Sequence, residues 1–177
     1  STVVVGDHGP DVAKAIQQKR IAAYAAGVRD TTVLVAFGIR MRDLTPPWLK
    51  MNPANTFTVL KSRVDELRPR LEKFLRVWAM ATRAAKLDPD RVSDLCRAAV
   101  PAAWANADAG QALMDASIYL SYPVTETFGA LQRDVWASLQ PLYRGVGLID
   151  AEGDAESFLD SSLIAVANDF TDAEIES

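Results

Sequence analysis

The stretch that decides the fold reads DVWASLQPLYRGVGLIDAEGDAESFLDSSLIAVANDF and runs from Asp134 to Phe170. Its first part has apolar residues at the spacing of one helix face (Trp136, Leu139, Leu142). An acidic linker follows a Gly-Val-Gly turn, and a second amphipathic pattern then predicts a helix from Ala155 to Asn168. The sequence therefore predicts a helical C-terminal portion.

The composition is that of a soluble globular protein. The chain has 177 residues, of which 49% are hydrophobic and 24% charged. Cys96 is the only cysteine, so an intrachain disulfide is excluded, and we expect its thiol to be buried. The chain opens on Ser-Thr-Val-Val-Val without an initiating methionine or signal peptide, which suggests the interior of a longer protein.

Charge is distributed unevenly along the chain. Residues 1–100 carry 17 Lys and Arg against 10 Asp and Glu, a balance of +7, whereas residues 101–177 carry 2 against 13, a balance of −11. A basic half is sometimes a nucleic-acid arm. Here the cations are scattered over predicted helices without interleaved exposed aromatic residues, so we expect solvated helix faces, mutual attraction of the two halves and no nucleic-acid partner.

The first sixty residues favour an α/β fold. Short β-branched or alternating runs predict strands at Val3–Val5, Ile21–Ala26, Met41–Leu44 and Thr56–Lys61. Pro10 suits the first turn of a helix. Residues 30–37 are ambiguous, because Thr31 to Val35 has strand propensity whereas Asp30 is placed to cap a helix, and we favour the helix.

Everything after Ser62 reads as helical. A stripe from Leu67 to Trp78 predicts one long amphipathic helix, and Asp88 is placed to cap the next one. Two further helices are predicted over 108–120 and 125–143. The tryptophans on these helices are expected in the core, and Trp48, after two prolines, is expected to be exposed.

The order of these segments resembles the C-terminal part of the ABC-transporter solute-binding proteins for sulfonates, taurine, nitrate and the thiamine pyrimidine precursor. The helix with Arg70, Phe74, Leu75, Arg76 and Ala79 looks like that family's segment before its conserved break, and Asp88-Pro89 looks like the break itself. The resemblance implies a partial type II periplasmic-binding-protein fold. Residues 1–55 would be part of the second α/β lobe, and 56–177 a crossing strand plus helices.

The resemblance also implies a function and a ligand site. The chain would be part of a periplasmic or extracytoplasmic solute-binding protein that delivers a small anionic or heteroaromatic ligand to an ABC permease, without catalysis, cofactor or metal. The implied ligand-binding residues are Asp7, His8, Gly9, Tyr24, Arg29 and Asp30. A helix start, an arginine and an aromatic ring are groups that hold such ligands. Alone, the chain would associate with itself or exchange elements in a dimer.

Plainer interpretations stand beside these assignments. Arg29 and Asp30 equally fit a surface pair, and Tyr24 a core position. His8 has no catalytic or metal partner at a recognised spacing, and the carboxylates from Asp150 to Asp160 lack the ligand pattern of a calcium loop. The alternative function is a self-standing, mainly helical protein–protein interaction domain. The observation that distinguishes this interaction domain from the solute-binding protein is whether residues 1–61 pack as strands of a sheet.

Overall fold

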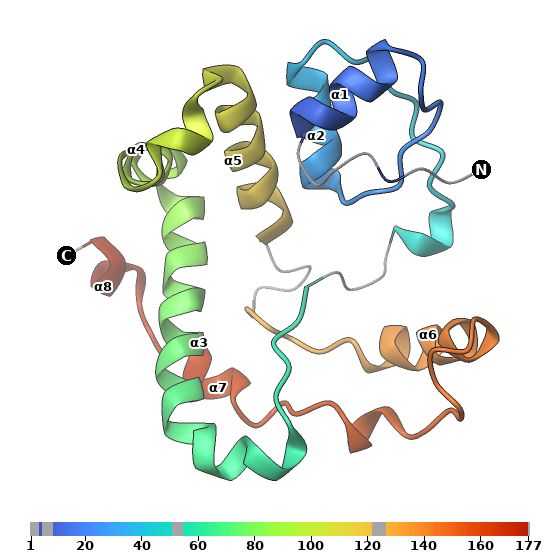
Figure 1. Cartoon of the computed structure of the whole chain (residues 1–177). Coiled ribbons are helices and arrows are strands. Elements are labelled where there is room, and N and C mark those ends of the chain that lie inside the picture. The colour runs from blue at the N-terminus through green and yellow to red at the C-terminus, as the bar shows by residue number, and fades with distance from the viewer. Residues whose placement is uncertain (1–3, 5–8, 51–54, 122–126, 177) are drawn as a thin grey trace. The chain divides into compact units, whose positions relative to one another are not determined.

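The computed structural model describes residue 4 and residues 9–50, 55–121 and 127–176. The fold over these residues is all-helical, without a β-strand (Figure 1). The predicted α/β class is therefore wrong. The chain forms two compact units, one of Ser1–Asp43 with Thr82–Tyr122 and one of Leu44–Ala81 with Pro123–Ser177. The division predicted at residue 55 stays a prediction of the family resemblance.

Unit 1 is built around two short helices, α1 (Gly9–Gln17) and α2 (Val28–Ala36). They pack together over a small apolar core formed by Val12, Ala13, Leu34 and Ile39. Pro10 does lie in the first turn of its helix, as predicted. The second helix also forms, but its N-cap is Gly27, so the prediction of Asp30 as the cap is wrong.

The other helices of unit 1 follow the end of α3 (Val64–Leu87). They are α4 (Pro89–Ala99), the 3-10 turn η3 (Pro101–Trp104) and α5 (Ala107–Ser121), which packs along α2. The Asp88 side chain accepts a hydrogen bond from the Arg91 amide at 2.9 Å, which confirms its predicted capping role. Asn106 caps α5 in the same way through the amide of Ala109.

Unit 2 contains α6 (Arg133–Gly145) and the first three-quarters of α3, with short helical turns around them. These turns are η1 (Pro47–Leu49), η2 (Lys61–Arg63), η4 (Ala155–Ser157), α7 (Ile164–Ala167) and α8 (Asp172–Glu176). The long helix predicted from the Leu67–Trp78 stripe is confirmed.

The strand predictions are wrong wherever the structure describes them. Residues 21–26, 41–44 and 56–60 have no regular structure, and Lys61 begins η2; of Val3–Val5 only Val4 lies among the described residues. A strand is stabilised by hydrogen bonds to a neighbouring strand, which none of these described segments has. Their apolar side chains pack on helices instead: Ile21 contacts the core of unit 1, and Phe57 contacts α3.

Two helices of the C-terminal portion are shorter than predicted. In the described part of the 125–143 segment, helix α6 begins only at Arg133, after Gly129 with its positive φ of 77°. The predicted 155–168 helix is interrupted, because the Asp160 side chain accepts the amide hydrogen of Ser162 at 2.8 Å. Such local bonds compete with the helical hydrogen-bond pattern.

Unit 2 is joined by side chains that hydrogen-bond to distant backbone. Asn168 accepts from the amide of Phe128 and donates to its carbonyl, both at 2.9 Å. Gln140, which is buried, makes the same reciprocal pair with Gly153 at 2.7 and 2.8 Å. These pairs fix loops that have no sheet or long helix to hold them.

Candidate interaction surface

The ligand-binding residues predicted from the resemblance all fall in unit 1, but Asp7 and His8 lie outside the described residues. Gly9 begins α1 at a close approach to α2, since a Cβ atom there would lie 2.6 Å from Cγ1 of Val33. This contact gives Gly9 a packing role that the sequence did not reveal.

The remaining predicted ligand residues lie near the same pair of helices. Tyr24 is partly buried against the apolar core of unit 1, as its plainer interpretation proposed. Arg29 and Asp30 are exposed neighbours in the first turn of α2. Their role in ligand binding stays a prediction.

A cluster of three aromatic side chains is the most distinctive surface feature of unit 2. We call Phe57, Phe74 and Trp78 the aromatic patch. The ring centroid of Phe57 is 5.2 Å from that of Phe74 and 5.1 Å from that of Trp78, with interplanar angles of 90° and 81°. Edge-to-face contacts at this distance are favourable beyond the area they bury. The three rings therefore form one cohesive cluster.

The aromatic patch is nevertheless open to solvent. Phe57, Phe74 and Trp78 are 51%, 46% and 47% exposed. The helix spacing predicted Phe74 and Trp78 as core residues, and this prediction is wrong. Phe57 was predicted only as part of a strand from Thr56 to Lys61, with no role at the surface. The only sequence signal for the patch was an aromatic pair four residues apart, which places both rings on one side of a helix.

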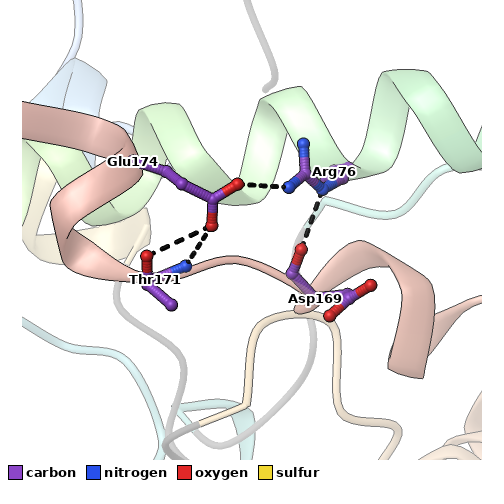
Figure 2. A network of polar contacts seen from close by, with 4 residues as sticks. All are labelled: Arg76, Asp169, Thr171 and Glu174. Carbon is purple, nitrogen blue, oxygen red and sulfur yellow. Dashed lines mark hydrogen bonds and ion pairs between the residues drawn. The ribbon is translucent and has the colours of Figure 1, made fainter. Parts of the chain in front are cut away.

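Another side of α3 is held by the C-terminal segment. Arg76 donates from Nε to the carbonyl of Asp169 at 2.9 Å and from Nη2 to Glu174 at 3.0 Å (Figure 2). Glu174 also accepts from the amide of Thr171 at 2.8 Å. The hydrogen bond from the Thr171 amide, followed by the one from Arg76, holds the pKa of the Glu174 carboxyl below its ordinary value.

Further contacts extend this attachment along α3. Arg68 donates to the hydroxyl of Ser162 at 3.1 Å. Asp160, near that contact, has its pKa lowered first by its hydrogen bonds from Ser162. The Arg76–Glu174 ion pair joins the basic and acidic halves of the chain, and the general attraction between these halves stays a prediction.

A shallow hollow of about 510 Å³ lies at the start of α6. It is lined by the consecutive residues Leu131 to Val135, and the Arg133 side chain is paired with Glu156. Because a single short segment forms the wall, the hollow does not surround a ligand as small-molecule sites do.

The described residues hold neither a cluster of metal-ligating side chains nor a helix that could cross a membrane. Among them, no three His, Cys, Asp or Glu side chains gather as metal ligands would. None of the described helices is both long and apolar enough to cross a membrane. Cys96 is only partly buried, so the expectation of a fully buried thiol is wrong, and Trp48 is 59% exposed, as predicted.

Comparison with known proteins gives no relative: no family model, curated protein or solved structure matches this chain. The candidate interaction surface is therefore identified from its geometry alone.

Proposed function

We propose that this chain is a helical protein-interaction module whose exposed apolar side chains are covered by another polypeptide. The observation that carries the proposal is the exposure of large apolar side chains on the described helices and on the segments between them.

Many large apolar side chains of the described residues are exposed. Only Leu34 and Val12 are fully buried among the larger side chains of the described residues. By contrast, several leucines and aromatic residues are more than half exposed, including Leu44, Trp48, Phe57, Leu60, Leu95, Tyr119, Leu148 and Phe158. Exposed apolar surface of this extent is typical of chains that complete their core with a partner.

The absence of strands from the described part of residues 1–61 further supports this choice. A binding-protein lobe needs a sheet there, whereas an all-helical interaction module does not. The described helices also offer several amphipathic faces, which is how helical modules recognise partners.

The test is a sedimentation and dye-binding experiment on the full chain. We expect it to associate as its concentration rises and to enhance the fluorescence of an apolar dye such as anilinonaphthalene sulfonate. We also expect the heat capacity of unfolding to fall below the roughly 2.1–2.7 kcal/mol/K that a fully buried chain of 177 residues would give. A monomer with no dye binding and the full heat capacity change would overturn the proposal.

A second candidate is the function that the family resemblance implies: contributing to a periplasmic solute-binding protein that serves an ABC permease. It is favoured by the helical segment Arg70–Ala79, which lies within α3, and by the restart of the helix at Pro89 after Asp88. In this candidate the covering polypeptide would be the remainder of a longer parent protein, and its ligand a small anionic or heteroaromatic molecule.

The intact mass of the protein in the cell separates the two candidates. A species of about twice this length carrying an export signal would favour the solute-binding role. The mature species would begin at Ser1 if the interaction module acts by itself.

A further inference from the structure

The aromatic patch has a defined polar border on α3. Arg70 lies one helical turn before Phe74. Lys73 directly precedes Phe74 in the chain and lies about 100° from it around the helix axis. Both cations are exposed, and among the described residues neither forms an ion pair. Val77, which is 65% exposed, adds apolar surface beside Phe74. The result is an apolar surface bordered by available positive charge.

The C-terminal segment is attached to other sides of the same helix. Successive residues of an α-helix are about 100° apart around its axis, so Arg76 lies about 200° from Phe74. Arg68 lies about 120° from it on the same count. The contacts of these arginines with Glu174 and Ser162 therefore lie on other sides of the helix than Phe74, whose side chain is 46% exposed.

We propose that the aromatic patch with Arg70 and Lys73 binds an acidic amphipathic helix of a partner protein. The proposal rests on the interaction function proposed above and gives that function a site and a partner chemistry. The surface from Arg70 to Trp78 covers nine residues of α3, or about 12 Å between the first and the last. That length matches two turns of a bound helix with apolar anchors at the first, fourth, fifth and eighth positions.

Charge complementarity selects an acidic partner. Two cations at the border attract carboxylates on the flanks of an apolar helix face, and this steers association as well as orientation. The partner's leucine or phenylalanine side chains would cover the exposed parts of Phe57, Phe74 and Trp78. Aromatic residues and arginine together are the residue types that dominate binding energy at protein interfaces.

Single-stranded nucleic acid fits this surface less well. Proteins that bind it offer ring faces on which bases stack in parallel and a strongly positive groove. Here Phe57 meets both other rings nearly at right angles, and the chain as a whole has a net charge of −4. We therefore propose a peptide partner, and preferential binding of single-stranded nucleic acid is the competing outcome of the experiment.

The experiment measures fluorescence anisotropy of labelled probes titrated with the full chain. One probe is a synthetic helical peptide with leucine and phenylalanine on one face and glutamate on its flanks. The second is the same peptide with every glutamate replaced by lysine, and the third is a 20-nucleotide oligothymidine. We expect the glutamate peptide to bind at least about tenfold more tightly than the lysine peptide.

Variants then assign the binding to this surface. Phe74→Ala and Arg70→Glu should each lower the affinity for the glutamate peptide by about tenfold or more. Arg70 is exposed, so its variant tests the site even if the Phe74 variant folds poorly, which circular dichroism would reveal. Phe158→Ala is the matched apolar control, since Phe158 is 52% exposed and contacts Trp136 instead. Arg63→Glu is the matched charge control.

The contradicting results are distinct from those that refute the interaction function. Equal binding of both peptides, loss of binding only in the controls, or preferential binding of oligothymidine would overturn the patch proposal. So would a homodimer in which Phe74→Ala abolishes self-association and no peptide competes. If the peptides fail while the chain still associates and binds dye, the patch proposal falls and the interaction function stands.

Discussion

Arg76 and Glu174 form an ion pair of 3.0 Å across 98 positions of the chain, and this pair attaches α8 to α3. The same guanidinium donates to the carbonyl of Asp169, so one side chain contacts both the segment just before α8 and α8 itself (Figure 2). No pattern in the sequence marks this arginine among its basic neighbours.

Replacing Arg76 by Gln should release α8. Because the pair is partly exposed, the expected effect is modest: amide hydrogen exchange over 171–176 should accelerate by roughly two- to fivefold. Arg63→Gln is the control, since Arg63 pairs with Glu66 on adjacent turns and makes no contact with α8 in the described chain. Equal acceleration in both variants would show that Arg76 does not attach the helix.

Acidification should weaken the same attachment. The hydrogen bonds of Thr171 and Arg76 lower the pKa of Glu174 in the folded chain. A lowered pKa means stabilisation that is present above the unfolded pKa and is lost as the pH falls through the folded one. Nuclear magnetic resonance of the 171–176 amides should thus show increasing mobility in the acidic range below the ordinary carboxyl pKa. Glu174→Gln should abolish that dependence, and a more rigid α8 in acid would contradict the assignment.

Gly110→Ala should destabilise unit 1. A Cβ atom at this position of α5 would lie 2.7 Å from the indole ring of Trp104, which is also in contact with Arg97. Overpacking of this kind costs about 1–3 kcal/mol. Thermal unfolding would measure the loss.

Gly145→Ala is the matched control for that measurement. A Cβ atom there meets nothing within 4 Å, and Gly145 is the last residue of α6. The free energy of unfolding of the Gly145→Ala variant should stay within about 0.5 kcal/mol of that of the unmodified protein. A destabilised Gly145 variant beside an unchanged Gly110 variant would refute the packing of η3 on α5.

Gln140→Glu should weaken the attachment of the 153 loop to α6. The amide group of Gln140 donates to the Gly153 carbonyl, and a carboxylate would place an acceptor against that oxygen. Leaving such a buried pair unsatisfied costs about 1–3 kcal/mol. Denaturant unfolding at neutral pH should show this loss, and protonation of the new carboxyl should restore part of it in acid. Gln18→Glu, at an exposed position, should change little.

Helices α3, α4 and α5 were largely predictable because their signals are local. The Leu67–Trp78 stripe, the Asp88 cap and the 108–120 pattern each depend on residues a few positions apart, and α3, α4 and α5 form close to those positions. Thr56–Lys61 was misread because its alternation satisfies strand propensity without providing a neighbouring strand. The ligand residues drawn from the family resemblance remain a prediction.

The candidate interaction surface was not predictable for a related reason. Helical spacing shows that Phe74 and Trp78 share a face, but it cannot tell whether another element covers that face. Phe57 joins them only because the segment before α3 folds back along it.

The sequence by itself determined where the long helices lie, how one of them is capped and how charge divides between the two halves of the chain. These properties follow from interactions within one or two helical turns. Only the tertiary structure decided that Arg76 meets Glu174, that Gln140 meets Gly153 and that the aromatic patch stays exposed. Each of these depends on contacts between distant segments, whose pairing the local sequence does not specify.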